Sequence, residues 1–595
     1  MPSDEEDLPR LSILYGSQTG NAEDVAVWIW RQAVLRRDVS LHLGTMDDYD
    51  LSASAKVKQT VLFVCSTTGQ GDPPDNMKKF WRSLLNRHLS ADFLNSWTVA
   101  VLGLGDSKYS NFNYAARKLH ARLIQLGAKG LLDVGLADDQ HPLGYESVVS
   151  VWKKNFWTEF HQLYPNVHQP TEAETSLQNR FNIIWQDQCR CVGEMCEKSQ
   201  RDEQSQPVEA EVVENRRITA EDHFQDVRLI SFELKPSVAY LPGDVVWVRP
   251  ANLDESVQLF HDTVQMEHLD RPFYLQPAFP GTPILETLQR ISPVLTFRHL
   301  ISNVFDLQAV PGCNFFKLFS LFAATELHRE KLQSFASPDG IDDLYNYCNR
   351  PRRTVVEVLS EFPETARNVP LEYWFDLLGE IKPRPFSICS SAQLDRQVEI
   401  VVAVVRYRTQ ISSDRLGLCS NWLKRLHAGH RLSVTIKHGS LVFPAADRPT
   451  ILIGPGTGVA ALRSFLRYRL ARKIDTTNVL FFGCRHRLKD YLFEKEFETM
   501  AKSGHIRLYT AFSRDQREKI YVQHLLRQQA PTIYKLLTEK DAIVYICGNA
   551  NSMPTQVIET LKQILVEEGS MSEEKADAYL KKMVTSKQLQ QEVWS

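Results

Sequence analysis

The chain has 595 residues, of which 43% are apolar and 24% charged, and its formal net charge is −3. This length exceeds what one hydrophobic core supports, so we expect two to four domains with the composition of an ordinary soluble protein. The nearly neutral charge offers no electrostatic footprint for nucleic-acid binding. An acidic N-terminus and the lack of any apolar run of about 20 residues argue against a signal peptide and a membrane span.

The ten cysteines are scattered, and several lie in apolar strand-like runs, as Cys65 and Cys547 do. This usage is expected of reduced thiols in the cytoplasm. Cys189, Cys191 and Cys196 crowd into a polar stretch and could together bind a metal. No fourth ligand follows at a zinc-finger spacing, so we expect exposed thiols there and no metal site.

The N-terminal region alternates apolar strands with amphipathic helical patterns. The expected strands are residues 11–16, 60–66, 97–103 and 131–136. Such alternation predicts a flavodoxin-like, doubly wound parallel sheet, which we place in a domain at residues 1–162. Residues 163–210 are rich in Gln, Glu, Asp, Ser and Thr and predict a flexible linker.

The rest of the chain predicts two further domains. Short alternating strands at 227–234, 384–390, 398–407 and 431–437 indicate an antiparallel β-barrel over residues 211–447. A mostly helical block, about 253–375, interrupts it as an insertion. Strand–helix alternation then resumes, with strands expected at 450–454, 478–483, 506–511 and 542–548, and predicts a second doubly wound domain at residues 448–595.

Two turns between a strand and a helix are suited to phosphate. The first, residues 17–22, is rich in hydroxyls, and the second, residues 454–460, is rich in glycine. Free backbone N–H groups and the helix dipole favour an anion at such a helix N-terminus. Two further loops, 66–74 and 102–113, also follow strands, and strand ends of a parallel sheet meet in one crevice. Tyr109 in the last loop either stacks on a flat ring or only anchors the loop.

The motifs SQTGNAED, STTGQGDPPDN and LGLGDSKYSNFN, in this order, resemble the FMN-binding module of the diflavin reductase family. The resemblance implies that FMN is held by Ser17, Gln18, Thr19, Gly20, Asn21, Ala22, Ser66, Thr67, Thr68, Gly69, Leu104, Gly105, Asp106, Ser107, Lys108, Tyr109, Ser110, Asn111, Phe112, Asn113 and Asp139. In the P450-reductase branch an aromatic residue stands where this chain has Thr68. We therefore expect one FMN face to lack that stacking partner.

The segment Arg384-Pro-Phe-Ser387 has the chemistry of a flavin dinucleotide site, although by itself it is also a strand with a surface arginine. An arginine fork suits a pyrophosphate, and the small-residue turn at 417–420 opens another helix. Together these segments resemble the FAD and NADPH modules of the ferredoxin–NADP reductase family. The resemblance implies that FAD is held by Arg352, Arg384, Pro385, Phe386, Ser387, Gly417, Leu418, Cys419, Ser420 and Trp594.

Two cations and two hydroxyls follow the strand that ends at Phe512, which suits a 2′-phosphate and favours NADP(H) over NAD. A solvated basic face is the alternative. By the resemblance, NADPH contacts Thr457, Ser513, Arg514, Lys519, Ile520, Tyr521, Val522 and Gln523. It also implies that Ser387, Cys547 and Glu592 position the hydride transfer, with Trp594 as a displaceable gate on FAD.

The resemblance covers nearly the whole chain, in the order FMN, linker, FAD, NADPH. The stretches GQGDPPDNMKKFW and YCNRPRRT most resemble the cytosolic branch of the diflavin reductases. That branch implies an iron–sulfur acceptor of the anamorsin type in cytosolic iron–sulfur cluster assembly. Acidic residues in the FMN loops, such as Asp72 and Asp106, either steer a basic acceptor or are ordinary solvated acids. The alternatives are the flavoprotein subunit of a sulfite reductase, a P450-reductase-like donor to haem proteins, and a flavin-binding scaffold without turnover.

Overall fold

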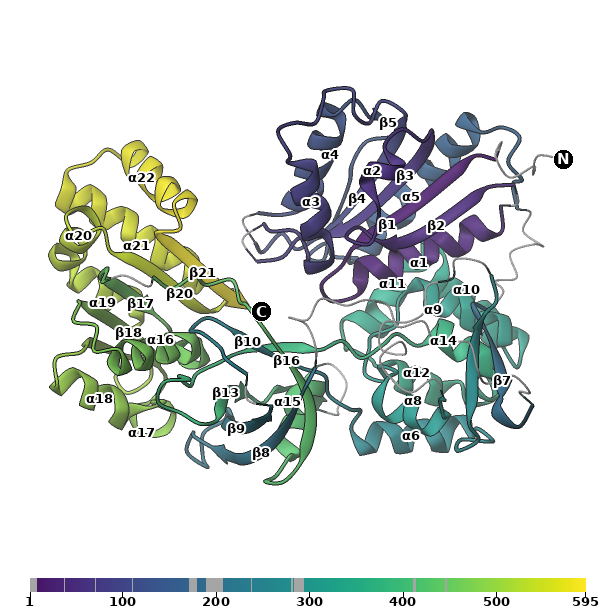
Figure 1. The fold of residues 1–595 in the computed structure, drawn as a ribbon. Coiled ribbons are helices and arrows are strands. Elements are labelled where there is room, and N and C mark those ends of the chain that lie inside the picture. The colour runs from purple at the N-terminus through teal and green to yellow at the C-terminus, as the bar shows by residue number, and fades with distance from the viewer. Residues whose placement is uncertain are drawn as a thin grey trace. The chain divides into compact units, whose positions relative to one another are not determined.

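The computed structural model describes residues 8–36, 38–69, 71–109, 111–170, 179–188, 207–236, 238–279, 282, 294–409, 414–444 and 447–594. The chain divides into two compact units (Figure 1). The first contains Met1–Lys198, Ala251–Lys382 and Arg408–Arg415, and the second contains Ser199–Pro250, Pro383–Tyr407 and Leu416–Ser595. The predicted cysteine cluster at 189–196 lies outside the described residues.

The first unit begins with the predicted doubly wound sheet. Its strands run in the order β2 (Ser40–Thr45), β1 (Arg10–Gly16), β3 (Gln59–Ser66), β4 (Trp97–Gly105) and β5 (Lys129–Gly130), with β6 (Gly135–Asp138) also paired to β4. All these pairs are parallel. The strand predicted at 131–136 is observed only from Gly135, as the start of β6, and residues 131–134 lie between β5 and β6, where the Trp152 indole donates to the Asp133 carbonyl.

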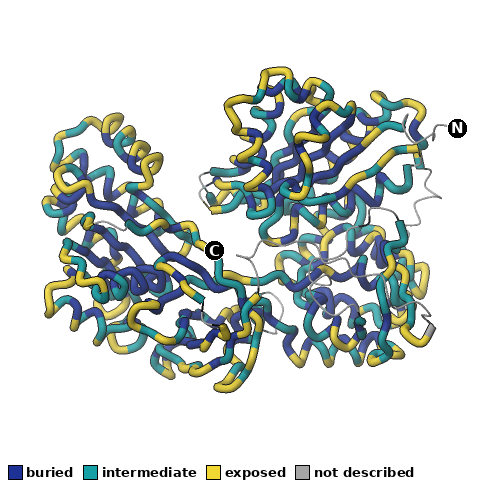
Figure 2. Tube along the Cα trace, in the orientation of Figure 1, coloured by how far each residue is buried: buried dark blue, intermediate teal, exposed yellow. Residues whose placement is uncertain are grey.

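Helices cover both faces of this sheet because successive strand residues point to opposite sides. Ile13 and its neighbours pack against α1 (Asn21–Val34) and α5 (Glu146–Leu163). Leu14 and its neighbours pack against α3 (Lys78–Leu84) and α4 (Tyr114–Gln125). The central strands β1, β3 and β4 are accordingly buried along most of their length (Figure 2). The short elements α2 (Leu51–Ser54) and η1 (Asp75–Met77) lie in the connections.

The rest of the first unit is the predicted helical insertion. Its helices are α6 (Asp254–Val264), α8 (Phe297–Asn303), α9 (Cys313–Phe319), α10 (Glu326–Ala336), α11 (Ile341–Leu344), α12 (Val355–Glu361), α13 (Pro363–Arg367) and α14 (Trp374–Leu377). They enclose an aromatic core that includes Phe260 and Phe375, and Trp28 of α1 joins that core. Strand β7 (Phe181–Trp185), inside the segment predicted as linker, pairs antiparallel with β11 (Phe273–Pro277).

The second unit opens with an antiparallel sheet. Its strand order is β12 (Arg384–Ser387), β10 (Val245–Val248), β16 (Arg431–Lys437), β8 (Val208–Arg217), β9 (Val227–Lys235) and β13 (Val398–Ala403). An antiparallel bridge between Ile388 and Ile400 joins the two ends of this order, so the sheet closes as the predicted barrel. Helix α15 (Leu418–Arg425) packs Cys419 and Leu423 into the barrel core.

A second parallel sheet completes this unit, in the order β19 (Arg507–Phe512), β18 (Asn478–Cys484), β17 (Thr450–Ile453), β20 (Ile543–Asn549) and β21 (Leu589–Trp594). One face is covered by α16 (Val459–Ala471) and α18 (Glu494–Lys502). The other is covered by α19 (Val522–Gln528), α20 (Ala530–Thr538), α21 (Ser552–Gly569) and α22 (Glu573–Thr585). The predicted multidomain α/β fold, with a barrel between two doubly wound sheets, is confirmed. Within the described part of the chain, no helix combines the length and apolar character that crossing a bilayer requires.

Candidate functional site

Both parallel sheets have a switch point, where the strand order reverses and ligands bind beyond the carboxyl ends of the strands. In the first sheet it lies between β1 and β3, and in the second between β17 and β20. The register places Gly16 beside Cys65, Ser66 beside Leu104, and Gly105 beside Asp138. The loops predicted to hold FMN therefore leave adjacent strand ends, although Ser110 lies outside the described residues.

The loop after β1 is held open for a ligand by hydrogen bonds to a neighbouring segment. The Ser17 N–H donates to Oδ1 of Asn76 over 2.9 Å, and the Gly20 N–H donates to the Ser17 hydroxyl over 3.0 Å. Gln18 exchanges two hydrogen bonds with Asp75. Gly20 caps α1 with a φ of +104°, a conformation that glycine adopts at little cost. The cradle of residues 17–22 thus presents N–H groups and hydroxyls at a helix N-terminus.

The other loops at this edge are pinned in the same manner. Thr68 bonds through its N–H and its hydroxyl to the Asp72 carbonyl, which closes the second loop. Asn113 is buried and donates to the Ala137 carbonyl over 2.9 Å, which ties the third loop to β6. Burial raises the pKa of Asp139, whereas the charge of Arg352 acts to lower it. Arg352, predicted near FAD, therefore lies in the first unit within electrostatic reach of an FMN-loop acid.

The predicted FAD residues of the second unit gather at the start of α15. The Gly417 N–H donates to the Val405 carbonyl over 3.0 Å, and the Val405 N–H donates to the Ser420 hydroxyl over 3.0 Å. A Cβ on Gly417 would lie 2.7 Å from the Val405 Cβ, so this turn requires glycine. Burial raises the pKa of the Cys419 thiol to about 12, and the charge of Arg384 acts against that rise. Arg384 and the first turn of α15 are therefore neighbours.

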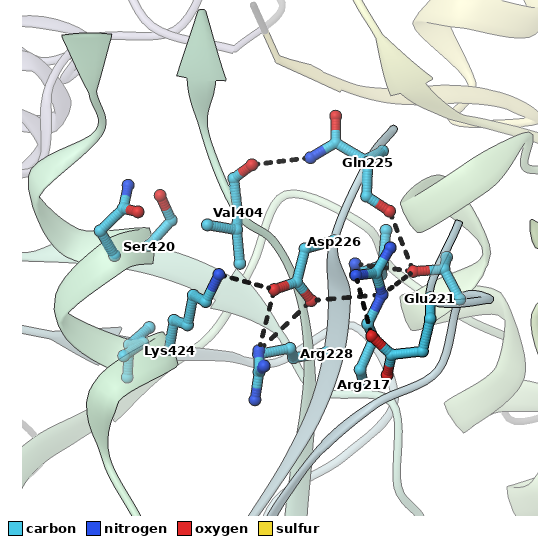
Figure 3. Close-up of polar contacts among 12 residues, drawn as sticks. Arg217, Glu221, Gln225, Asp226, Arg228, Val404, Ser420 and Lys424 are labelled. Carbon is cyan, nitrogen blue, oxygen red and sulfur yellow. Dashed lines mark hydrogen bonds and ion pairs between the residues drawn. The ribbon is translucent and has the colours of Figure 1, made fainter. Parts of the chain in front are cut away.

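A charged cluster supports this helix from behind (Figure 3). The Asp226 carboxylate lies 3.1 Å from Lys424 Nζ and 3.3 Å from Arg228 Nε, with Arg217 Nε at 3.9 Å. Lys424 belongs to α15, so its ion pair ties the helix to the turn between β8 and β9. In the same turn Gln225 donates to the Val404 carbonyl over 2.7 Å, next to the residue that bonds Gly417 and Ser420.

The glycine-rich loop after β17 approaches the end of β20. A Cβ on Gly458 would lie 2.2 Å from the Cys547 carbonyl oxygen, so this approach requires glycine. Gly456 has a φ of +58°, and a Cβ there would meet open space. Thr457 lies between them and is partly exposed. The loop therefore offers open backbone beside the end of β20.

The predicted 2′-phosphate residues lie together at the ends of β18 and β19. The N–H groups of Ser513 and Arg514 donate to the carbonyls of Cys484 and Arg485, each over 2.9 Å. A hydrogen bond from Arg514, with the charges of Arg514, Lys519 and Arg485, lowers the pKa of Tyr521. Val522 is buried in the sheet core, so only its backbone is available to a ligand.

Ser387, Cys547 and Glu592, far apart in sequence, meet in the second unit. The Ser387 hydroxyl donates to Glu592 Oε2 over 3.2 Å, and Cys547 is the register partner of Glu592 on the adjacent strand. Ser440 donates to the other carboxylate oxygen over 3.4 Å. Burial raises the pKa of Glu592, and burial with the charge of Glu592 raises that of Cys547. Strand β12 of the barrel and strands β20 and β21 of the parallel sheet thus hold a hydroxyl, a thiol and a carboxyl together.

Trp594 follows on the same edge strand. Its carbonyl accepts from the Ala550 N–H over 2.8 Å, and 38% of the residue is exposed. The end of β21 is therefore held next to β20 by its backbone, while the Trp594 indole remains accessible.

Sequence reasoning missed three residues of these sites. Arg485 follows the strand predicted at 478–483, and the rule that selected Arg514 at the next strand end would have selected it. Ser440 and Asp226 lie in turns without a motif, and only the fold brings them to Glu592 and to α15. No local signal could have identified these two.

Comparison with known proteins agrees with this arrangement. The family Flavodoxin matches residues 13–152, the family FAD binding domain matches residues 200–422, and the family Oxidoreductase NAD-binding domain matches residues 452–558. A Danio rerio protein named NADPH-dependent diflavin oxidoreductase 1 is 42% identical over 98% of this chain and 99% of its own length.

Proteins of the same name from other organisms also align from end to end. The Xenopus laevis protein is 41% identical, and the Arabidopsis thaliana protein is 34% identical. Each alignment covers 98% of this chain and 99% of the relative. The chain belongs to the family of NADPH-dependent diflavin oxidoreductases.

Proposed function

We propose that this chain passes electrons from NADPH to an iron–sulfur protein of the anamorsin type, in cytosolic iron–sulfur cluster assembly. The chain is an NADPH-dependent diflavin oxidoreductase with FMN, FAD and NADPH as cofactors, as its flavodoxin, FAD-binding and NAD-binding domains indicate. When bound, these groups would supply the redox chemistry: FAD would accept a hydride from NADPH, and FMN would deliver single electrons. The meeting of Ser387, Glu592 and Cys547 carries the catalytic part of the proposal.

The first-unit cradle fits a flavin monophosphate. Residues 17–22 supply N–H groups at the start of α1 together with hydroxyls, and these donors suit the oxygens of a phosphate. The loops after β3 and β4 would border the ring system. We assign the FMN site to this edge of the sheet, with Ser17 and Thr19 as phosphate ligands.

Arg384 and residues 417–420 at the start of α15, which we call the platform, fit a flavin dinucleotide. Arg384 and the N-terminus of α15 lie close together and both favour a pyrophosphate. The close approach of Gly417 to Val405 requires glycine at the start of this helix. We assign the FAD pyrophosphate to this pair, with Ser387 at the reacting end. For NADPH, the open backbone of 456–458 and the cations near Tyr521 suit its pyrophosphate and 2′-phosphate.

We assign Glu592, Ser387 and Cys547 to orienting the nicotinamide and stabilising its charge during hydride transfer. The Glu592 carboxylate would stabilise the positive charge that a bound nicotinamide gains on giving up a hydride, and the Ser387 hydroxyl holds that carboxylate in place. Cys547, whose pKa is raised by burial, stays a neutral thiol. Its bulk therefore positions the nicotinamide without adding a second negative charge.

Two observations support the proposed acceptor: the acidic residues in the FMN loops and the unpaired cysteines of the described residues. Asp72 is exposed and Asp106 is partly exposed there, so a basic face on the acceptor would be attracted. The cysteines of the described residues are unpaired thiols, which supports a reducing compartment such as the cytosol.

The test is NADPH-driven reduction of purified candidate acceptors, followed spectroscopically. We expect an anamorsin-type iron–sulfur protein to be reduced, and more slowly at high salt because screening weakens steering. Reduction of a sulfite-reductase haem subunit instead would contradict the assigned acceptor. Failure to reduce cytochrome c, a generic acceptor, would contradict the enzymatic role itself.

A further inference from the structure

Helix α1 is held against the insertion, residues 251–382, by two charged contacts. Near its end, Arg31 Nη1 lies 2.7 Å from Asp376 Oδ1, which Arg180 also contacts at 2.6 Å, and the Arg31 and Asp376 side chains are 4% and 0% exposed. In its first turn, Glu23 Oε2 lies 2.9 Å from Lys382 Nζ. The second contact lies beside the cradle assigned to FMN.

The Lys382 side chain lies against Gly20 of the cradle as well as pairing with Glu23. A Cβ built on Gly20 would lie 2.7 Å from the Lys382 Cε and 3.6 Å from its Nζ. Gly20 is also the N-cap residue of α1, and its φ is positive. The ammonium group of the insertion therefore lies beside Gly20, at the start of α1.

The charge balance of the cradle calls for such a cation. Residues 17–22 contain no cationic side chain, and two acids, Glu23 and Asp24, follow immediately. Burial raises the pKa of Asp24 to about 6, which indicates how strongly this site resists negative charge. A phosphate dianion added beside these acids is repelled unless a cation compensates. Lys382 pairs with Glu23, and the charges of Lys382 and Arg180 both act on Asp24.

We propose that Lys382 is an FMN-phosphate residue that the insertion supplies to the flavodoxin-like cradle, with Glu23 competing for its ammonium group. The inference rests on the proposed FMN site at residues 17–22. It gives FMN a second effect. Because the phosphate attracts a residue of the insertion, bound FMN strengthens the contact between the insertion and α1, and loss of FMN weakens it.

The test measures FMN dissociation constants of selectively FMN-depleted, full-length protein. We expect Lys382→Met to weaken FMN binding about tenfold and Glu23→Gln to strengthen it, because the first removes the compensating cation and the second removes a competing anion. Lys382→Arg should stay close to the unmodified protein. The salt dependence of FMN binding should be smaller in Lys382→Met. The matched control is Lys78→Met, which breaks an exposed ion pair with Asp75 near the same cradle.

The opposite signs separate this role from a merely structural one. Glu23→Gln and Lys382→Met break the same ion pair, so a purely structural contact would make both weaken FMN binding, and that result overturns the inference. Unchanged affinity in both also overturns it, provided that FAD content and thermal unfolding stay normal. Thr19→Val tests the cradle separately. Weak FMN binding in Thr19→Val with normal binding in Lys382→Met rejects only the role of Lys382, whereas normal binding in Thr19→Val rejects the proposed FMN site as well.

Discussion

The Ser387 hydroxyl donates to a carboxylate oxygen of Glu592 over 3.2 Å, across 205 positions of sequence. Ser387 ends β12 of the barrel, and Glu592 lies on β21, at the edge of the parallel sheet. The hydrogen bond therefore connects the strand assigned to FAD with the strand next to the nicotinamide side, within one unit.

The pH dependence of flavin reduction should report on this hydrogen bond. Burial raises the pKa of Glu592, against hydrogen bonds from Ser387 and Ser440. If the ionised carboxylate stabilises the transition state, FAD reduction falls as pH drops through this raised pKa. Ser387→Ala removes a bond to the ionised form, so the pKa rises further and the acidic limb moves to higher pH. We expect a rate loss of about tenfold to a hundredfold in stopped-flow FAD reduction by NADPH.

Two further variants complete this measurement. Glu592→Gln should abolish the acidic limb, and Ser440→Ala should move it in the same direction as Ser387→Ala. Glu211→Gln, in an exposed ion pair of the same unit, is the control and should leave the profile unchanged. An acidic limb that stays in place in Ser387→Ala contradicts the role given to the carboxylate.

Cofactor choice should depend on Arg514. Its side chain lies with Tyr521, Lys519 and Arg485, where a 2′-phosphate would be neutralised. Arg514→Ala should weaken NADPH binding about a hundredfold, which is the effect expected from losing an ionic hydrogen bond to a charged ligand. The same variant should change NADH binding little. Steady-state KM values for both cofactors give the comparison, and Arg507→Ala, at the opposite end of β19, is the control. Equal loss for NADPH and NADH refutes the 2′-phosphate assignment.

Retention of FAD should depend on Asp226, which lies behind the platform (Figure 3). Asp226→Ala leaves Lys424 and two arginines without their shared acid, which should loosen α15 and lower FAD content without lowering FMN content. Flavin stoichiometry of the purified protein measures both. Asp226→Glu should restore much of the FAD, and Lys235→Gln, on the exposed end of β9, should change neither flavin. Parallel loss of both flavins would indicate general unfolding and contradict the specific role.

Stability should depend on the protonation of Asp24. Burial raises its pKa from 3.8 to about 6, so the folded chain holds the proton more tightly than the unfolded chain does. The contribution of the protonated Asp24 to the free energy of unfolding is complete below pH 3.8 and is lost as the pH rises through about 6. The loss in the free energy of unfolding is about 3 kcal/mol at most. Asp24→Asn stays neutral and should raise the Tm at neutral pH and flatten the pH dependence. Thermal unfolding of the FMN-free full-length chain measures this, with the exposed Glu568→Gln as control.

The fold was accessible from sequence because its signals are local. Apolar strands followed by small-residue turns marked β1, β3, β4 and β17 together with the loops that leave them, and the parallel register then brings those loops to one edge. Residues at strand ends, such as Ser17 and Arg514, are found in this way because the rule needs no distant partner.

Residues whose position depends on a distant partner could not be found. Strand β7 is five residues long in a polar stretch, and its partner β11 lies far along the chain, so the segment resembled a linker. The same holds for Lys382, which reaches Glu23 over 359 positions. Its own neighbourhood, Ile381-Lys-Pro-Arg384, indicates only a strand start. Contacts of this kind depend on how the insertion packs on α1, which no short pattern encodes.

Trp594 should decide how easily the nicotinamide reaches FAD. Its backbone is fixed to β20 through the Ala550 N–H, whereas its indole is accessible, so the side chain can leave without unfolding the strand. If the indole occupies the FAD face that the nicotinamide needs, each cofactor must displace it. On the proposed 2′-phosphate site, NADPH would gain contacts that offset that cost and NADH would not. Trp594→Ala should therefore raise kcat/KM for NADH about tenfold more than for NADPH, as removal of one stacking contact predicts. Trp594→Phe should give a cofactor preference between those of the unmodified protein and Trp594→Ala. An unchanged cofactor preference of Trp594→Ala in steady-state assays would rule out the gate.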